Sequence, residues 1–231
     1  MSPRLLATVA LLPLLLAALP AAAQEGPTPD ATLLDEVVVT ASRIETPRSA
    51  IAATVELIDA EAIVQQTALA ASAVDTVAAL VPSFSPTRQK LSGFGETLRG
   101  RSPLYLVDGV PQSTPLRVDS RDGYTIDLAM VERIEVIHGA SAEHGLGATG
   151  GIINFVTRRP EGTDLRQHIG VGVSAPTDYE SDGLSYETDY RLEGIHGDWD
   201  FLLGGAYKSR GLFYDADGRA VGNDQAKGDT M

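Results

Sequence analysis

The chain has 231 residues, of which 43% are hydrophobic and 21% charged, a balance that suits one or two folded domains and excludes disorder throughout. It carries 18 Lys and Arg against 31 Asp and Glu, so the formal net charge is -13, and electrostatic repulsion argues against a nucleic-acid partner. The absence of cysteine excludes a disulfide scaffold, a thiolate metal site and a cysteine nucleophile.

Residues 1–23 have the pattern of an export signal. Arg4 gives a positive start, Leu5–Leu19 is almost wholly apolar, and small alanines precede Gln24, where we expect cleavage. A membrane anchor is the alternative, but the apolar run is shorter than the roughly 20 residues that span a bilayer, and it contains Pro13. We therefore expect an exported protein.

Residues 24–52 read as a flexible leader that carries one short β-branched run. Asp35–Ala41 begins with acidic residues, and the next stretch, Ser42–Pro47, again lacks periodicity. Since no adjacent strand is apparent, we expect the run to add as an edge strand to the sheet of another protein. A buried strand of the following domain is the alternative. The residues expected to pair with the partner are Asp35, Glu36, Val37, Val38, Val39 and Thr40.

Residues 53–160 have the mixed pattern of a small α+β domain, with enough chain for one modest core. Ser72 and Asp75 are able to cap a helix that Pro82 closes. The expected strands are Thr54–Ile58, Leu104–Val107, Arg133–Ile137 and Ile152–Val156, and the expected helical segments are Ala60–Gln66, Ser72–Leu80 and Asp127–Val131.

Residues 161–231 change to an alternation of apolar and polar side chains with a period of two. A soluble antiparallel sheet is one interpretation. The long polar connection Ser174–Ser185 and the tight His196–Asp198 turn instead match the unequal loops of an outer-membrane barrel. We therefore expect the first antiparallel strands of a transmembrane β-barrel at Leu165–Val173, Tyr186–Leu192 and Trp199–Tyr207.

Two stretches of the α+β domain carry a family resemblance. Leu98–Arg101 followed by Leu104–Pro111 is similar to the arginine-glycine and Asp-Gly-Val-Pro pattern of TonB-dependent receptor plugs. Val131–Ser141 followed by His144–Thr157 resembles the closing signature of the same plugs almost residue for residue. The family often has Pro in place of Ala140 and Tyr in place of His144. With Asp35–Ala41, which looks like a TonB box, the resemblance covers roughly residues 35 to 210.

The resemblance implies active uptake across the outer membrane. In the family a plug fills a barrel of 22 strands, a ligand binds outside the cell, and the TonB protein uses the proton gradient to remodel the plug. The ligand is most often a ferric siderophore, less often haem, cobalamin or a carbohydrate. Three strands cannot close a barrel among outer-membrane lipids, so we expect a fragment or a truncated product. A non-transporting plug module that still binds TonB is the alternative.

Two groups of plug residues are candidates for binding. Arg99 and Arg133 are expected to face acidic residues of the barrel wall, as the resemblance implies, although exposed arginines without defined pairs are the alternative. The polar segments Ser83–Glu96 and Pro111–Tyr124 are expected to face an anionic ligand, unless their charges bridge to the barrel or neutralise nearby aspartates. The ligand candidates are Arg88, Gln89, Lys90, Phe94, Arg117, Arg121 and Tyr124.

Other chemistry is not indicated. Gly145–Gly150 forms a G-x-G-x-x-G run, but a dinucleotide fingerprint needs a helix after it, and Ile152–Thr157 has the pattern of a strand. The four histidines lack metal-ligand spacing, so we expect surface or interface residues, no metal and no cofactor. Without a nucleophile motif or an acid and base pair, we expect no enzyme activity.

Overall fold

The computed structural model describes residues 38–41, 46–69, 72–86, 91–112, 121–160, 164–177, 181–221 and 228–230. The expected signal at residues 1–23 lies outside them. No helix among the described residues is long and apolar enough to cross a membrane.

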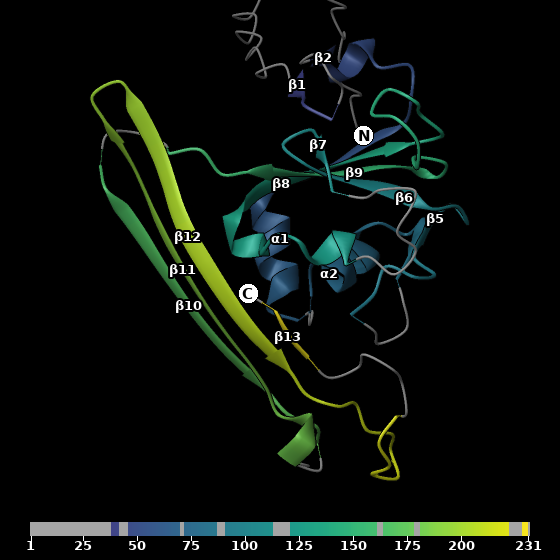
Figure 1. Ribbon diagram of the computed structural model, residues 1–231, viewed down its shortest axis with the longest axis vertical. Coiled ribbons are helices and arrows are strands. Elements are labelled where there is room, and N and C mark those ends of the chain that lie inside the picture. The colour runs from purple at the N-terminus through teal and green to yellow at the C-terminus, as the bar shows by residue number, and fades with distance from the viewer. Residues whose placement is uncertain are drawn as a thin grey trace, which may run out of the picture. The chain divides into compact units, whose positions relative to one another are not determined.

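A five-stranded sheet forms the centre of the α+β domain (Figure 1). Strands β6 and β9 run parallel, and every other neighbouring pair is antiparallel. The sequence predicts the four longer strands because each is a short, largely apolar run, and all but β6 are rich in β-branched residues. In spatial order the strands are β3 (Val55–Ile58), β8 (Val131–His138), β9 (Gly151–Thr157), β6 (Pro103–Val107) and β7 (Val110–Pro111).

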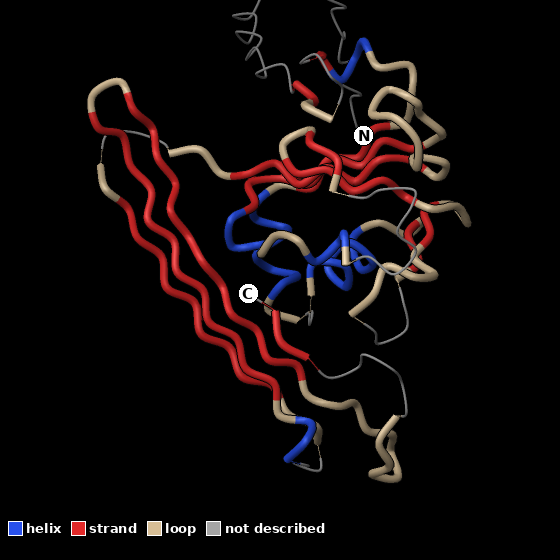
Figure 2. Tube along the Cα trace, viewed as in Figure 1, coloured by secondary structure: helices blue, strands red, loops and turns tan. Residues whose placement is uncertain are grey.

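Two short helices lie against one face of this sheet, α1 (Ala60–Thr67) and α2 (Ala73–Leu80) (Figure 2). Asp59 caps α1 by accepting a 2.8 Å hydrogen bond from the Ala62 amide. Ser72 caps α2 by accepting from the amide of Asp75 at 3.2 Å. Both helices and the cap at Ser72 confirm the sequence prediction, since a hydroxyl or carboxylate at this position satisfies an otherwise free amide.

The remaining elements of this part of the chain are short. The expected helical turn is present, because Asp127 accepts a 2.9 Å hydrogen bond from the Ala129 amide and starts a single 3-10 turn. The short elements are β1 (Val38–Val39), β2 (Thr46–Pro47), η1 (Arg48–Ala50), β4 (Phe84–Ser85), β5 (Thr97–Leu98), η2 (Asp122–Tyr124) and η3 (Leu128–Met130).

Each face of the five-stranded sheet contributes side chains to its own apolar cluster. Ile134 and Phe155 point to the face covered by α1 and α2. Leu106 and Ile152 point to the opposite face, where they meet Val39 of the leader. The strand period of two explains the division, since successive side chains leave a strand on opposite sides. The central sheet is therefore buried on both faces.

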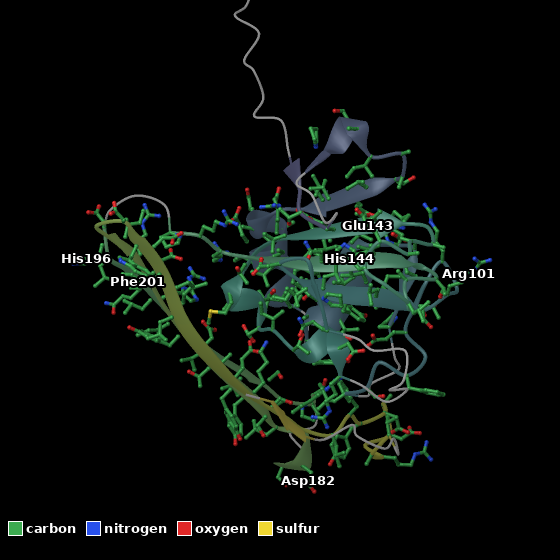
Figure 3. All side chains as sticks on the ribbon, turned by 45° about the horizontal axis from the view of Figure 1, so that its top comes forward. Arg101, Glu143, His144, Asp182, His196 and Phe201 are labelled. Carbon is green, nitrogen blue, oxygen red and sulfur yellow. The ribbon has the colours of Figure 1, made fainter. Side chains whose placement is uncertain are left out.

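A second, antiparallel sheet follows in the order β10 (Arg166–Ser174), β11 (Ser185–His196), β12 (Trp199–Arg210) and β13 (Gly228–Thr230). The sequence predicts the first three strands and the tight turn between β11 and β12, but not β13. Only three residues of β13 pair with β12, too few for a periodic signal. Figure 3 places His196 at the β11–β12 hairpin and Asp182 at the other end of the strands. The fold is thus the expected α+β domain followed by antiparallel strands.

One face of the second sheet presents apolar side chains to its surroundings. The alternation is regular, because Ile169, Val171 and Val173 of β10 are all exposed while glycines separate them. Leu203 and Trp199 continue this exposed apolar surface on β12. Contiguous exposed apolar surface marks a membrane or protein contact in a folded protein.

Candidate functional site

The described end of the leader is docked on the α+β domain. Strand β1 pairs antiparallel with β2, with Val38 opposite Pro47 and Val39 opposite Thr46. The Val39 and Ala41 side chains are fully buried, at 0% exposure. The expectation that no strand lies beside Asp35–Thr40 is therefore wrong for Val38 and Val39. The chain reverses after Ala41 and supplies the pairing strand itself.

Glu135 holds the leader from the centre of the sheet. Its side chain is 0% exposed, and its carboxylate accepts hydrogen bonds from the Ala41 amide at 2.7 Å and the Thr40 amide at 3.0 Å. The Thr40 hydroxyl donates at 3.2 Å, and Asn154 Nδ2 donates at 3.0 Å. Hydrogen bonds to a buried carboxylate are charge-assisted and stronger than neutral ones. Glu135 thus fixes the leader through backbone groups that every non-proline residue has.

The Asp-Gly turn between β6 and β7 closes the same site from one side. Asp108 and Gly109 both have positive φ, 48° and 77°, which suits the two central residues of a tight hairpin. The Gly109 amide donates to Asn154 Oδ1 at 3.0 Å. A side chain at position 109 would place its Cβ 3.3 Å from the Thr40 carbonyl oxygen. Glycine here therefore serves the turn and also lets the leader approach the backbone.

His144 closes the site from the glycine-rich segment that precedes β9. Its Nε2 lies 2.6 Å from the Ala41 carbonyl oxygen, a distance at which the ring donates a hydrogen bond (Figure 3 shows His144 beside Glu143). We call Glu135, Asn154, Gly109 and His144 the leader cradle. His138, which is expected at a surface or an interface, has a buried side chain with Nε2 3.4 Å from Glu56.

The two arginines predicted to reach a barrel wall lie in different settings. Arg133 points to its own domain, with Nε 3.0 Å from Glu135 and a second contact to Glu132 at 3.4 Å. Arg133 therefore balances the buried carboxylate of the cradle. Arg99 is exposed in the turn after β5, with a φ of 52°. The prediction that either arginine contacts a barrel remains a prediction.

The expected ligand-facing residues are only partly within the described chain. Arg88, Gln89, Lys90 and Arg117 lie outside it. Phe94 is 57% exposed and Arg121 is exposed at the start of η2, whereas Tyr124 is half-buried and packs against the helix-side core. The described part thus offers Phe94 and Arg121 as accessible groups.

Glu96, the last residue of the polar segment that is expected to face an anionic ligand, does not lie at the surface. It is buried, and its carboxylate accepts a 2.6 Å hydrogen bond from the Tyr105 hydroxyl of β6. Burial and the neighbouring Glu96 carboxylate raise the pKa of Tyr105. The same two causes, burial first, raise the pKa of Tyr124. The Tyr105 hydroxyl therefore stays protonated and donates to the Glu96 carboxylate at neutral pH.

Contacts between the α+β domain and the second sheet involve residues that sequence analysis does not single out. Lys208 Nζ lies 3.2 Å from Asp127 and 2.9 Å from Glu187. Arg191 donates to the Ala129 carbonyl oxygen, and a Cβ at Gly204 would collide with the Met130 side chain. Lys208 and Arg191 lie on the polar faces of their strands. The alternation of apolar and polar residues was therefore the only sequence signal that could have pointed to these contacts. Among the described residues, no group of three or more potential ligand side chains could hold a metal ion.

The fold and these contacts define a leader-bearing α+β domain that touches the polar face of an antiparallel sheet. Residues 47–152 match the family model of the TonB-dependent Receptor Plug Domain. The rhizobactin receptor of Rhizobium meliloti (strain 1021) is 35% identical over 156 residues, 64% of this chain and 21% of that protein. The ferric aerobactin receptor of Klebsiella pneumoniae is 38% identical over 151 residues, 65% of this chain and 20% of that protein.

Solved structures agree with these relatives. A variant of the ferric enterobactin receptor of Pseudomonas aeruginosa, 25% identical, matches 77% of this chain and 27% of its own with a TM-score of 0.58. The alcaligin outer-membrane receptor of Bordetella pertussis, 18% identical, shares the fold over 75% of this chain and 29% of its own, with a TM-score of 0.56. The chain therefore carries the plug domain of a TonB-dependent receptor, followed by antiparallel strands. It spans about a fifth of the length of the two curated relatives.

Proposed function

We propose that this chain is the N-terminal part of an outer-membrane receptor that takes up a ferric siderophore. The carrying observation is that the plug domain continues into strands whose outward face is apolar and whose polar residues Arg191 and Lys208 touch the plug. Such a sheet suits lipid on one side and a plugged lumen on the other. The names of the relatives, receptors for rhizobactin and ferric aerobactin, support a siderophore as ligand. All of them are receptors, which supports transport rather than enzyme activity.

Energy coupling is assigned to Asp35–Thr40, which we propose to pair with the C-terminal domain of TonB as an added strand. Val38→Pro removes one backbone donor from this strand and disfavours further pairing. We expect the receptor carrying this substitution to bind ferric siderophore normally and to lose its accumulation. Ala31→Pro, in the proline-containing leader before the box, is the matched control and keeps uptake. Normal accumulation in the Val38→Pro receptor would show that the coupling strand lies elsewhere.

Ligand binding is assigned to the two polar segments Ser83–Glu96 and Pro111–Tyr124. Their arginines, Arg88, Arg117 and Arg121, concentrate positive charge in an acidic chain. An anionic ferric complex would receive charge-assisted hydrogen bonds from them. Each Arg→Gln change is expected to weaken binding about 10-fold to 100-fold, the equivalent of roughly 1.5–3 kcal/mol. The loss should shrink as salt is added. Unchanged affinity in all three variants would move the site to the barrel loops.

The ligand class is tested by direct binding to the receptor that carries this chain. We expect ferric rhizobactin or ferric aerobactin to quench its intrinsic fluorescence at micromolar or lower concentration, with haem, cobalamin and oligosaccharides as the comparison set. Tight binding of haem, cobalamin or a carbohydrate with no response to either siderophore would replace the proposed ligand class. Either result would leave the assignment of the plug domain unchanged.

A further inference from the structure

The two polar segments proposed to face the ligand end at the same buried tyrosine. Glu96, the last residue of Ser83–Glu96, is 3% exposed and accepts a 2.6 Å hydrogen bond from the Tyr105 hydroxyl of β6. Gly123 lies in η2 at the end of Pro111–Tyr124, and a Cβ added to it would lie 3.2 Å from Tyr105 Cζ. Tyr105 therefore contacts the end of both segments.

Tyr105 itself is fixed by the plug core. Its side chain is buried, its backbone pairs with Ile153 of β9, and its ring stacks on Phe155. On the other side of η2, a Cβ at Gly123 would lie 2.7 Å from Val74 Cγ2 of α2. The η2 turn thus lies between a buried ring and a helix, with room for glycine alone at its centre.

An exposed group lies one backbone turn away from each of these contacts. Phe94 is 57% exposed, and in the same turn the Glu96 amide donates to the Gly93 carbonyl oxygen at 3.2 Å. Arg121 is exposed, and the Tyr124 amide donates to its carbonyl oxygen at 2.8 Å. A short hydrogen-bonded turn has few backbone conformations, so the buried contacts determine how far apart Phe94 and Arg121 lie.

We propose that Tyr105 is a positioning residue of the ligand site, which sets the spacing of Phe94 and Arg121 without touching the ligand. The inference rests on the proposed function, because it concerns the same binding segments. An aromatic ring and a guanidinium held at a fixed spacing bind a rigid anionic complex with a smaller loss of conformational entropy than mobile groups do. Buried supporting residues keep binding groups in the productive geometry in this way.

Two substitutions disturb the two contacts separately. Tyr105→Phe removes the hydroxyl that donates to Glu96 and keeps the ring beside Gly123. Gly123→Ala pushes η2 away from Tyr105 and Val74, because both of these side chains are buried in a packed core. Neither substitution changes an exposed residue, so the ligand-facing groups keep their chemistry.

Two control variants separate positioning from a general loss of plug stability. Ile63 of α1 is 1% exposed, and Ile63→Val weakens the core without changing either binding segment. Tyr190→Phe removes a tyrosine hydroxyl from the exposed face of β11. All variants are made in the receptor that carries this chain, and the probes are ferric rhizobactin and ferric aerobactin.

We expect Tyr105→Phe and Gly123→Ala each to weaken siderophore binding about tenfold, while both controls keep the parental affinity. The loss should disappear once the positioned group is gone. Tyr105→Phe should change affinity less than about twofold in a Phe94→Ala receptor, and Gly123→Ala should do the same in an Arg121→Gln receptor. A residue that only stabilised the plug would cause the same loss in either background, because the effects of independent sites add.

Parental affinity in both Tyr105→Phe and Gly123→Ala, or a loss that persists in the Phe94→Ala and Arg121→Gln backgrounds, overturns the inference and leaves the proposed ligand site standing. A different result identifies failure of the proposed site itself. If Phe94→Ala and Arg121→Gln alone bind both siderophores as tightly as the parent, the two segments are not the ligand site, and the positioning role fails with them.

Discussion

Gly150 is a position where even the smallest side chain should damage the plug. It precedes β9 and lies between two backbone segments, with its amide 2.9 Å from the Ser102 carbonyl oxygen. A Cβ added here would lie 2.5 Å from the Arg101 carbonyl oxygen and 2.6 Å from that of Leu98. Both neighbours are backbone atoms, so no rotamer change can relieve the clash. In Gly150→Ala the start of β9 must move away from the Leu98–Arg101 turn.

The magnitude follows from the two consequences of that movement. Overpacking in a filled interior costs typically 1–3 kcal/mol. Loss of the Ser102 bond adds about 0.5–1.5 kcal/mol, so we expect the Gly150→Ala plug to lose roughly 2–4 kcal/mol. Gly205→Ala is the control, because no atom lies within 4 Å of a Cβ at that position and its φ is not positive. We expect that control to be neutral.

Amide hydrogen exchange in the receptor that carries the chain measures the effect strand by strand. Exchange of the β6 and β9 amides should accelerate about 30-fold to 1000-fold in Gly150→Ala if these strands open through the weakened plug. Amides of β11 should keep their rates, since the substitution lies outside that sheet. Parental exchange rates in β6 and β9 would refute the close backbone approach at Gly150 and the reasoning that depends on it.

Three further predictions concern single side chains. Tyr105→Phe removes the bond to Glu96 and should lower plug stability by about 1.5–3 kcal/mol in urea. Because the folded-state pKa of Tyr105 is raised, its stabilisation is present below about pH 10 and is lost as the pH rises further, a decline that the variant should flatten. Arg133→Gln removes the cationic partner of buried Glu135 and should cost up to roughly 3–5 kcal/mol in the same urea assay. Lys208→Met breaks the ion pair with Asp127 and should lower the thermal midpoint by only a few degrees, as befits about 1 kcal/mol or less per pair.

Local signals account for what the sequence predicts correctly. The α2 helix begins at Ser72 and ends before Pro82, and both signals lie within a few residues of the helix they limit. The strands β10 to β12 alternate with a period of two over most of their length, so neither their faces nor their turn needs distant information. The Asp108–Gly109 turn is fixed by backbone preferences of the two residues themselves.

What the sequence leaves out depends on residues that are far apart in the chain. No residue near Thr40 in the sequence indicates that its amide donates to the carboxylate of Glu135, 95 residues later. Arg133 stands in a motif whose resemblance suggested a barrel partner, yet its nearest acid is Glu135 on the same strand face. Glu96 lies in a polar stretch, and only the fold brings the Tyr105 hydroxyl to it. In each case the sequence alone predicts a charged residue at the surface, because the partner that allows its burial is identified only in the folded structure.

Strand β9 contributes side chains to both faces of the central sheet. Phe155 stacks on Tyr105 at 6.3 Å on the helix side, while Asn154, one residue earlier, donates to Glu135 on the leader side. Slipping β9 by one residue would exchange these faces, placing an amide in the helix-side core and an aromatic ring in the cradle. Such a shift would disrupt the core and the leader site together, because it moves every side chain of β9 to the opposite face. The packing of the core therefore also holds Asn154 in register for the leader, since Tyr105 and Asn154 lie on the paired strands β6 and β9.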